Sequence, residues 1–202
     1  MNILLMNGLP YEYEGIPLSA DFRNMINAEL ILHDEDIPES EKWMQALNQL
    51  YAETPADAQQ ALDGFTWFFH RGKAESGGKQ VAHKGKGFDF NQDASMIFAA
   101  FYGAYNISLS TIDFLHWWEF MALFEGLPDD TMIKRAMYYR TADTTGMGKA
   151  EKKHVEKMRG IFQLKGTEKA PISIEDLNQQ TKDRVARRLA EANRLLEERK
   201  GM

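Results

Sequence analysis

Apolar residues recur three or four residues apart through much of the segment that follows residue 18. This spacing places them on one face of an α-helix, and a helix start signal precedes each apolar run. The runs and their signals are 22–32 after Ser19 as N-cap and Asp21, 43–50 after Pro38 with Glu39 and Glu41, and 58–69 after Thr54, Pro55 and Asp57. We therefore expect amphipathic helices to fill residues 19–71.

The first 18 residues do not follow the helical period. Their apolar residues are interrupted by two turn signals, Asn7-Gly8 and Glu14-Gly15, and a proline follows two residues after each glycine. Such glycine-containing turns between short apolar stretches are typical of β-hairpins. The segment 1–18 is therefore predicted to form a small β-hairpin.

Residues 88–165 are the aromatic-rich part of the chain. From Ala94 to Tyr105 the apolar residues again fall on one helical face, with Asp89 or Asn91 as the expected N-cap. Two further helices are expected after this region, from Asp129 to about Tyr139 and, after a break at 141–148, a charged one to about Leu164.

Between these helices lies a segment that is apolar on nearly every side. We expect it to open at Ser110, to run through Ile112 to Phe124, and to end at Gly126 and Pro128. A helix of this kind must be buried on most sides, because so much exposed aromatic surface would drive aggregation.

The Gly- and Lys-rich stretch 72–87 has almost no apolar residues, so we expect a flexible basic loop there. Residues 1–165 are predicted to form a single helical domain, and 166–202 a linker with a C-terminal helix. That last helix has a thin apolar seam between Ile174 and Leu196. The predicted fold class is mostly α, a bundle of about seven or eight helices with a small N-terminal β-hairpin and a long C-terminal helix.

The net charge of −6 is unevenly distributed along the chain. Residues 1–65 hold 12 acidic and 2 basic side chains, whereas residues 66–87 hold 5 basic and 1 acidic. We interpret the two segments as paired within the chain, because opposite charges attract. An acidic chain with so short a basic stretch does not have the many phosphate contacts of a nucleic-acid-binding protein, so we expect no nucleic acid as a partner.

The absence of cysteine excludes disulfides, thiolate metal sites and a cysteine nucleophile. The chain begins without a basic region ahead of an apolar run, and no apolar stretch approaches the roughly 20 residues that cross a bilayer. We therefore expect a protein of the cytosol that is not secreted and has no membrane partner.

Two patterns suggest chemistry, and neither is typical of its class. The stretch from Gly72 resembles a phosphate-binding loop, but five residues separate Gly72 from Gly78 and Gln80 replaces the Ser or Thr that binds magnesium. Asp113, His116 and Glu119 are three residues apart, which on a helix spreads them over roughly a third of the circumference. We interpret these as a basic loop and a polar stripe, and expect no catalytic residue, cofactor or metal ion.

The aromatic residues of 88–140 divide into an expected core and a candidate docking surface. The core face is Ile97, Phe101, Trp117 and Met121. The candidate docking residues, to the extent that they are exposed, are Phe98, Tyr102, Tyr105, Trp118 and Phe124. A stacking platform for single-stranded nucleic acid is the weaker interpretation, because such platforms lie in basic grooves. Aromatic residues dominate the energetic centres of protein interfaces.

The segment from Phe88 to Thr141 resembles the core of a family of small proteins encoded by long-tailed bacteriophages and prophages of Gram-positive hosts. The run from Asp93 through His116-Trp117-Trp118 to Arg140 carries most of this resemblance. The turn at Gly15-Ile16-Pro17-Leu18, which leads into Asp21-Phe22-Arg23, looks like the opening of that family. Residues beyond Lys165 match poorly.

Genes of this family typically lie just before the tape-measure gene, which implies a role like that of tail assembly chaperones. The resemblance implies a helical, non-enzymatic protein of the bacterial host cytoplasm that binds the tape-measure protein while tail-tube subunits are recruited. The major tail protein is a second expected partner, and homo-oligomerisation is left open. Two alternative functions are a minor structural protein of the tail and a metal-dependent hydrolase that uses His116 and nearby carboxylates.

Overall fold

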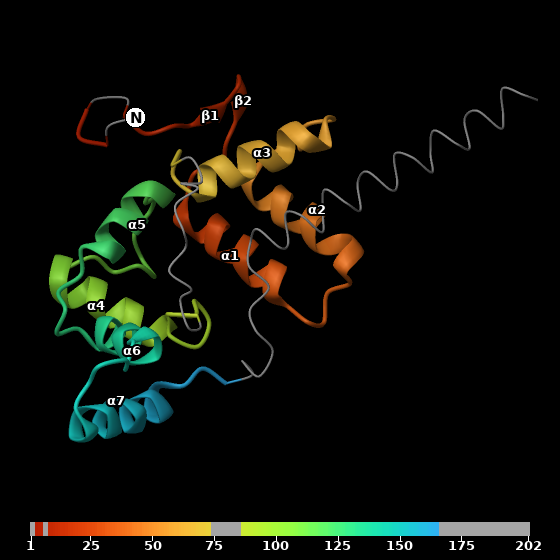
Figure 1. The fold of residues 1–202 in the computed structure, drawn as a ribbon. Coiled ribbons are helices and arrows are strands. Elements are labelled where there is room, and N and C mark those ends of the chain that lie inside the picture. The colour runs from red at the N-terminus through yellow and green to blue at the C-terminus, as the bar shows by residue number, and fades with distance from the viewer. Residues whose placement is uncertain (1–2, 6–7, 74–85, 166–202) are drawn as a thin grey trace, which may run out of the picture. The chain divides into compact units, whose positions relative to one another are not determined.

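The computed structural model describes residues 3–5, 8–73 and 86–165 (Figure 1). The chain divides into two units, Met1–Leu164 and Lys165–Met202. The predicted C-terminal helix and most of the predicted basic loop 72–87 lie outside the described residues. The described part is mostly α-helical and carries an antiparallel two-stranded hairpin near its N-terminus, as the sequence predicts.

Seven helices and two short strands make up the regular structure of the described residues. The elements are β1 (Glu12–Tyr13), β2 (Ile16–Pro17), α1 (Phe22–His33), α2 (Glu39–Leu50), α3 (Ala58–Phe69), α4 (Ala94–Tyr105), α5 (Trp117–Glu125), α6 (Met132–Thr141) and α7 (Lys149–Phe162). No helix among these residues is long and apolar enough to cross a membrane.

The hairpin turns at the second of the two predicted signals. Tyr13 pairs with Ile16, and the two residues between them, Glu14 and Gly15, both have positive φ angles, 50° and 80°. Two consecutive residues of this conformation match the right-handed twist of the flanking strands. The Glu14-Gly15 prediction is therefore confirmed.

The helices α1 and α3 begin at aspartates instead of at the expected Ser and Thr. Asp21 caps α1 by accepting a hydrogen bond from the Arg23 N–H at 2.9 Å, while the Ser19 N–H donates to the carbonyl of Leu50 at 2.7 Å. Ser19 is thus held in an extended segment tied to the end of α2, which moves the cap two residues along. Asp57 caps α3 in the same way by accepting from the Gln59 N–H at 2.9 Å.

The predicted helix from Ser110 is wrong in its first part, because α5 begins only at Trp117. The Trp117 N–H donates to the carbonyl of Ala20 at 2.8 Å, and the Phe22 N–H donates to the carbonyl of Leu115 at 2.9 Å. These two bonds, between segments far apart in the sequence, hold the backbone ahead of Trp117 in extended form. A helix start at Ser110 would need the same groups for its own hydrogen bonds.

The later helix starts also differ from the predictions by a few residues. Asp93 precedes α4, while the Asp89 carboxylate accepts from the Asn91 and Gln92 N–H groups at 2.9 Å and closes the turn ahead of the helix. Thr131 precedes α6, three residues after Pro128. Gly126 ends α5 as expected.

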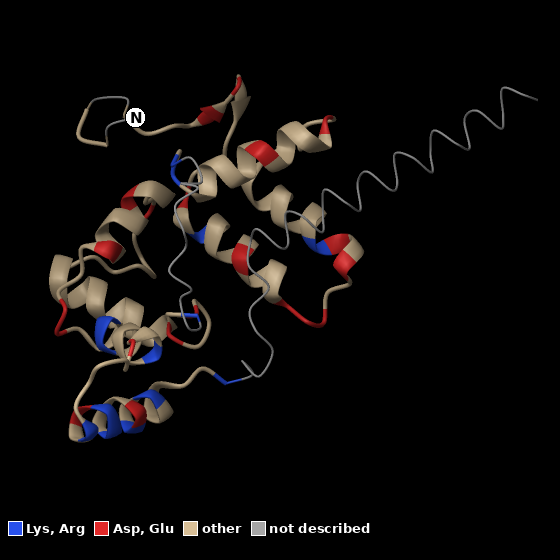
Figure 2. Ribbon diagram, in the orientation of Figure 1, with Lys and Arg blue, Asp and Glu red and all other residues tan. Residues whose placement is uncertain are grey.

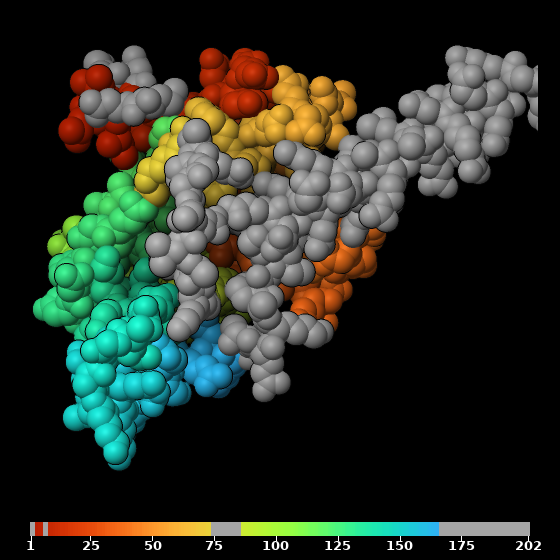
Figure 3. All heavy atoms as spheres, viewed as in Figure 1, coloured from red at the N-terminus to blue at the C-terminus, as the bar shows by residue number. Residues whose placement is uncertain are grey.

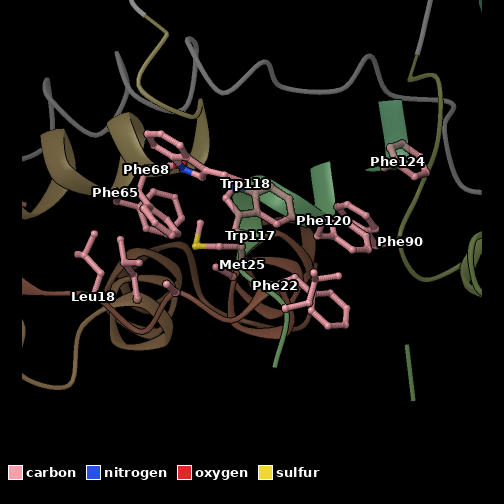
Figure 4. Close-up of a cluster of buried hydrophobic side chains, with 14 of the residues drawn as sticks. Leu18, Phe22, Met25, Phe65, Phe68, Phe90, Trp117, Trp118, Phe120 and Phe124 are labelled. Carbon is pink, nitrogen blue, oxygen red and sulfur yellow. The ribbon is translucent and has the colours of Figure 1, made fainter. Parts of the chain in front are cut away.

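The core forms where α1 and α5 face each other (Figure 4). Phe120 is fully buried, stacked on Phe22 at 4.8 Å and on Phe101 at 5.0 Å between ring centroids. Trp117 is 1% exposed, and its indole N–H donates to the carbonyl of Phe69 at 3.1 Å, which ties α5 to the end of α3. Stacked aromatic pairs add to the stabilisation that burial of their area already provides.

A buried ion pair joins α4, α6 and α7. Arg140 donates to both carboxylate oxygens of Asp93, at 2.6 and 2.9 Å. Two of its other N–H groups donate to the carbonyls of Phe162 at 2.6 Å and Gly87 at 3.1 Å. Two hydrogen bonds in the fork geometry of a guanidinium and a carboxylate fix orientation as well as distance. The pair therefore sets how the last two helices of the unit pack on α4.

Candidate protein-docking surface

Helix α4 presents an uncharged face outward. Its twelve residues include no Asp, Glu, Lys or Arg, and its inner side is held in the core by Ile97, Ala100 and Phe101. The outward positions are Ala94, Ser95, Phe98, Ala99, Tyr102, Gly103 and Ala104. In a chain of which 27% is charged, an exposed helix face without a charge is the kind of surface that protein interfaces use.

Phe98 and Tyr102 form a stacked pair on this face. Their ring centroids are 6.3 Å apart and the ring planes differ by 7°, while the two residues are 38% and 55% exposed. Residues four apart on a helix lie one above the other, which brings the rings together. The pair is a large, pre-arranged aromatic surface that a partner can cover without reordering it.

The space beside the aromatic pair is open. Ser95, Ala99 and Gly103 follow one another at four-residue intervals along the same face, and a Cβ added to Gly103 would meet nothing within 4 Å. Small side chains let a second helix approach closely, whereas the neighbouring rings give it apolar area to cover. The face thus fits an apolar helical partner by shape as well as by lack of charge.

Of the other three candidate residues, two are buried and one lies at the edge of this surface. Trp118 is 7% exposed and its indole N–H donates to the carbonyl of Phe68 at 2.8 Å, while Phe124 is 2% exposed against Phe88 and Phe120. Tyr105 is half-buried and its hydroxyl donates to the Leu123 carbonyl at 2.9 Å, so it lies at the edge of the surface.

The expected core face is buried where the sequence places it. Ile97, Phe101 and Trp117 are at most 3% exposed, and Met121 is partly buried against the same cluster. Trp118 and Phe124 join this core because α5 begins at Trp117 and packs against α3 on one side and the segment before α4 on the other. The docking candidates that remain are Phe98 and Tyr102.

A second exposed aromatic pair was missed in the sequence. Tyr11, in the segment before β1, stacks on Phe114 with 6.4 Å between ring centroids, and the residues are 54% and 45% exposed. Neither residue lies in a helix, so no periodic pattern identifies them. Tyr11 also meets the edge of the His116 ring at 5.3 Å.

His116 has a structural role that accounts for both of its ring nitrogens. It is fully buried, its Nδ1 accepts from the Trp118 N–H at 3.0 Å, and its Nε2–H donates to the carbonyl of Pro10 at 2.9 Å. The side chain therefore caps α5 and holds the N-terminal segment. Burial lowers the pKa of His116, which favours the neutral ring that this arrangement requires.

The metal-site alternative does not fit this geometry. Asp113 lies in the irregular segment before α5, so Asp113, His116 and Glu119 do not share one helix as the alternative requires. In the part of the chain that the structure describes, no group of three or more His, Asp or Glu residues could hold a metal ion. The predicted phosphate-loop comparison falls on residues 72–80, of which only 72 and 73 are described.

The predicted pairing of the acidic and basic segments is observed in part. Lys86 lies 3.3 Å from Glu29 and 3.1 Å from Asp89, so it joins the acidic front to the segment before α4. Arg71 pairs instead with Glu125 at the end of α5, at 2.5 Å. Burial raises the pKa of Glu29, and the charge of Lys86 opposes that shift.

Comparison with known proteins identifies one family. No curated protein and no solved structure matches the chain. The family model described as "Bacteriophage Gp15 protein" matches residues 5–164, from the N-terminal segment to the end of the first unit. This span includes all seven described helices and both partners of the buried Asp93 and Arg140 pair. The chain therefore belongs to the Bacteriophage Gp15 protein family.

Proposed function

We propose that this phage protein is a non-enzymatic tail morphogenesis factor, an assembly chaperone that binds the tape-measure protein in the host cytoplasm during tail-tube assembly. Membership of the phage family supports the setting. The resemblance to proteins encoded just before the tape-measure gene supports the partner. The observation that carries the proposal is the uncharged outer face of α4 with its exposed pair Phe98 and Tyr102.

The chemistry of this face suits a long helical partner. A helix of twelve residues is about 18 Å long, so a partner helix of similar length with an apolar stripe would cover it. Because the face has no charged side chain, covering it removes no ion from water, and the main cost of binding is the ordering of the partner. A matching stripe on the tape-measure protein should likewise be apolar and uncharged.

We assign no catalytic step to the chain. The hydrolase alternative would use His116, but the two ring nitrogens of His116 hold the start of α5 and the carbonyl of Pro10. A ring engaged in this way is unavailable as a base or a ligand unless the N-terminal segment moves away. The hydrolase alternative would require that movement as well as new carboxylate neighbours.

Co-expression with the tape-measure protein of the same phage, followed by pull-down, tests the proposal. The wild-type chain should capture the tape-measure protein, and the variant F98A/Y102A should lower the affinity at least about tenfold, since such aromatic anchors each contribute about 2 kcal/mol or more. Tyr138→Ala is the matched control, because Tyr138 is 52% exposed on another helix. No complex with the wild type, together with normal tails from phage that lack the gene, would refute the proposal.

A minor structural protein of the tail is the second candidate. Exposed aromatic residues serve a permanent subunit contact as well as a transient one, so the surface alone does not separate the two. Mass spectrometry of purified particles does, because a chaperone should be absent from the mature virion and a tail subunit present. A pull-down of the major tail protein shows whether it is an additional partner.

A further inference from the structure

Helix α7 packs on α6 along one side, where Arg159 donates to the carbonyls of Tyr139 and Ala142, but most of its surface is exposed and strongly basic. Only Val155 of its fourteen residues is fully buried. Its exposed basic side chains are Lys149, Lys152, Lys153 and Lys157. Over residues 131–165 the sequence holds nine basic and three acidic residues, a net of +6. The same helix also exposes one large apolar side chain, that of Ile161, which is 63% exposed.

The opposite charge gathers around the connection between α1 and α2. Asp34, Glu35 and Asp36 are consecutive and exposed there, and Glu41 follows in the first turn of α2. Residues 8–65 hold twelve acidic and two basic residues, a net of −10. The two basic residues, Arg23 and Lys42, already pair with acidic neighbours in the same segment.

The two charged regions belong to one folded unit and lie apart in it. In Figure 2 the basic side of α7 and the acidic connection of α1 and α2 are on different sides of the view. In the space-filling view, α7, in cyan to blue, and α2, in orange, are seen at different places (Figure 3). Among the described residues, no ion pair joins the exposed lysines of α7 to the acidic residues of the α1–α2 connection.

We propose that the chain self-associates head to tail, the basic face of α7 in one copy docking on the acidic α1–α2 connection of the next. The occupant of each surface is then a second copy, selected by charge complementarity. Such a contact uses two different patches, so every copy keeps one acidic and one basic end for further copies. Association continues into an open array or closes into a ring. This inference does not rest on the proposed function.

The distribution of positive and negative charges along α7 favours a protein partner over nucleic acid. Glu151 and Glu156 interrupt the basic residues of the helix, and the whole chain is acidic with a net charge of −6. Nucleic-acid binding depends on many uninterrupted phosphate contacts. When α7 docks on an acidic protein surface, in contrast, the two glutamates can lie at the rim of the contact, exposed to water.

The contact should be weak and sensitive to salt. A helix of fourteen residues is about 21 Å long, and its exposed side covers less than the roughly 800 Å² per partner of a standard interface. Between about 25 mM and about 300 mM NaCl the Debye length falls from roughly 20 Å to roughly 6 Å. We expect the apparent dissociation constant to rise at least about tenfold over this range.

Sedimentation velocity of the full chain over a concentration series tests the inference with two charge-reversed variants. One, K152E/K153E/K157E, makes the basic end acidic, and the other, D34K/E35K/D36K, makes the acidic end basic. Each variant alone should remain monomeric at low salt, whereas an equal mixture should associate, because the acidic end of the first meets the basic end of the second. The control D129K/D130K changes exposed residues outside both patches and should associate like the wild type.

Several outcomes would overturn the inference. They are a wild-type chain that stays monomeric at low salt, a mixture that does not associate while both variants keep their circular dichroism spectra, and an oligomer that survives both reversals. Binding of a DNA duplex that K152E/K153E/K157E abolishes, with no self-association, would assign α7 to nucleic acid instead. Recovery of association in the mixture alone supports it, since unfolded variants would not regain it.

Discussion

Removal of the Asp93 carboxylate should destabilise the fold strongly, because it leaves a buried guanidinium without its counter-ion. Asp93 is 1% exposed and accepts two hydrogen bonds from Arg140 and one, at 2.9 Å, from the Asp89 N–H. In Asp93→Ala, Arg140 keeps only the carbonyls of Phe162 and Gly87 as partners. Breaking a buried ion pair from one side costs about 3–5 kcal/mol of unfolding free energy.

Thermal and denaturant unfolding, followed by circular dichroism, measure this loss. For a folded unit of about 160 residues, each kcal/mol lowers Tm by roughly 2–4 °C, so Asp93→Ala should melt roughly 6–20 °C below the wild type. Glu125→Gln is the control, because Glu125 belongs to an ion pair with Arg71 but is itself 52% exposed in that pair. Its loss should cost less than about 1 kcal/mol.

A double variant tests whether the cost of Asp93→Ala comes from the uncompensated charge of Arg140. Asp93→Ala/Arg140→Leu removes both charges, so no ion is left uncompensated in the interior. Its destabilisation should be smaller than the sum of the two single variants by about 1–3 kcal/mol. If the free energies simply add, or if Asp93→Ala costs less than about 1 kcal/mol, the pair does not hold α4, α6 and α7 together as we describe.

Two further predictions concern the stability of the fold, one at two glycines and one at His116. Gly64→Ala should lower the free energy of unfolding by about 1–3 kcal/mol, because the added Cβ would clash with the Tyr51 hydroxyl and lie 2.7 Å from the Tyr13 ring. Gly103→Ala should instead stabilise α4 by about 0.5–1 kcal/mol, because a Cβ at this position meets nothing within 4 Å. Denaturant unfolding measures both changes, and equal effects of the two substitutions would contradict this packing. The free energy of unfolding should fall as the pH drops from 7 through the lowered folded-state pKa of His116, because the imidazole of the unfolded chain binds the proton first. His116→Gln should flatten the slope of unfolding free energy against pH. An unchanged slope would exclude the capping role of the neutral ring.

The local part of the fold is predictable from the sequence. The periods of 22–32, 43–50 and 58–69, with the start signals that precede them, identify α1, α2 and α3 almost to their ends, because each helix buries one apolar stripe against the same core. The Glu14-Gly15 turn is predictable for a similar reason, since few residue pairs adopt two positive φ angles in succession.

Features that depend on contacts between distant segments are not predictable in this way. The start of α5 depends on hydrogen bonds between residues 20–22 and 115–117, which no local pattern encodes. The same shift decides that Trp118 is buried against α3. It also separates Asp113 from His116 and Glu119, so the polar stripe expected on one helix does not form. The uncharged face of α4, in contrast, can be seen in the sequence alone, because every residue of the helix lacks charge.

Photo-crosslinking during tail assembly tests the central claim, that the α4 face docks the tape-measure protein, most directly. The photoreactive residue p-benzoylphenylalanine replaces Tyr102 in one phage strain and Tyr138 in a control strain, since both tyrosines are about half exposed, at 55% and 52%. Crosslinked partners are then identified by mass spectrometry. We predict that the Tyr102 position captures the tape-measure protein and that the Tyr138 position does not. Capture of the tape-measure protein from neither position, or equally from both, would contradict the account.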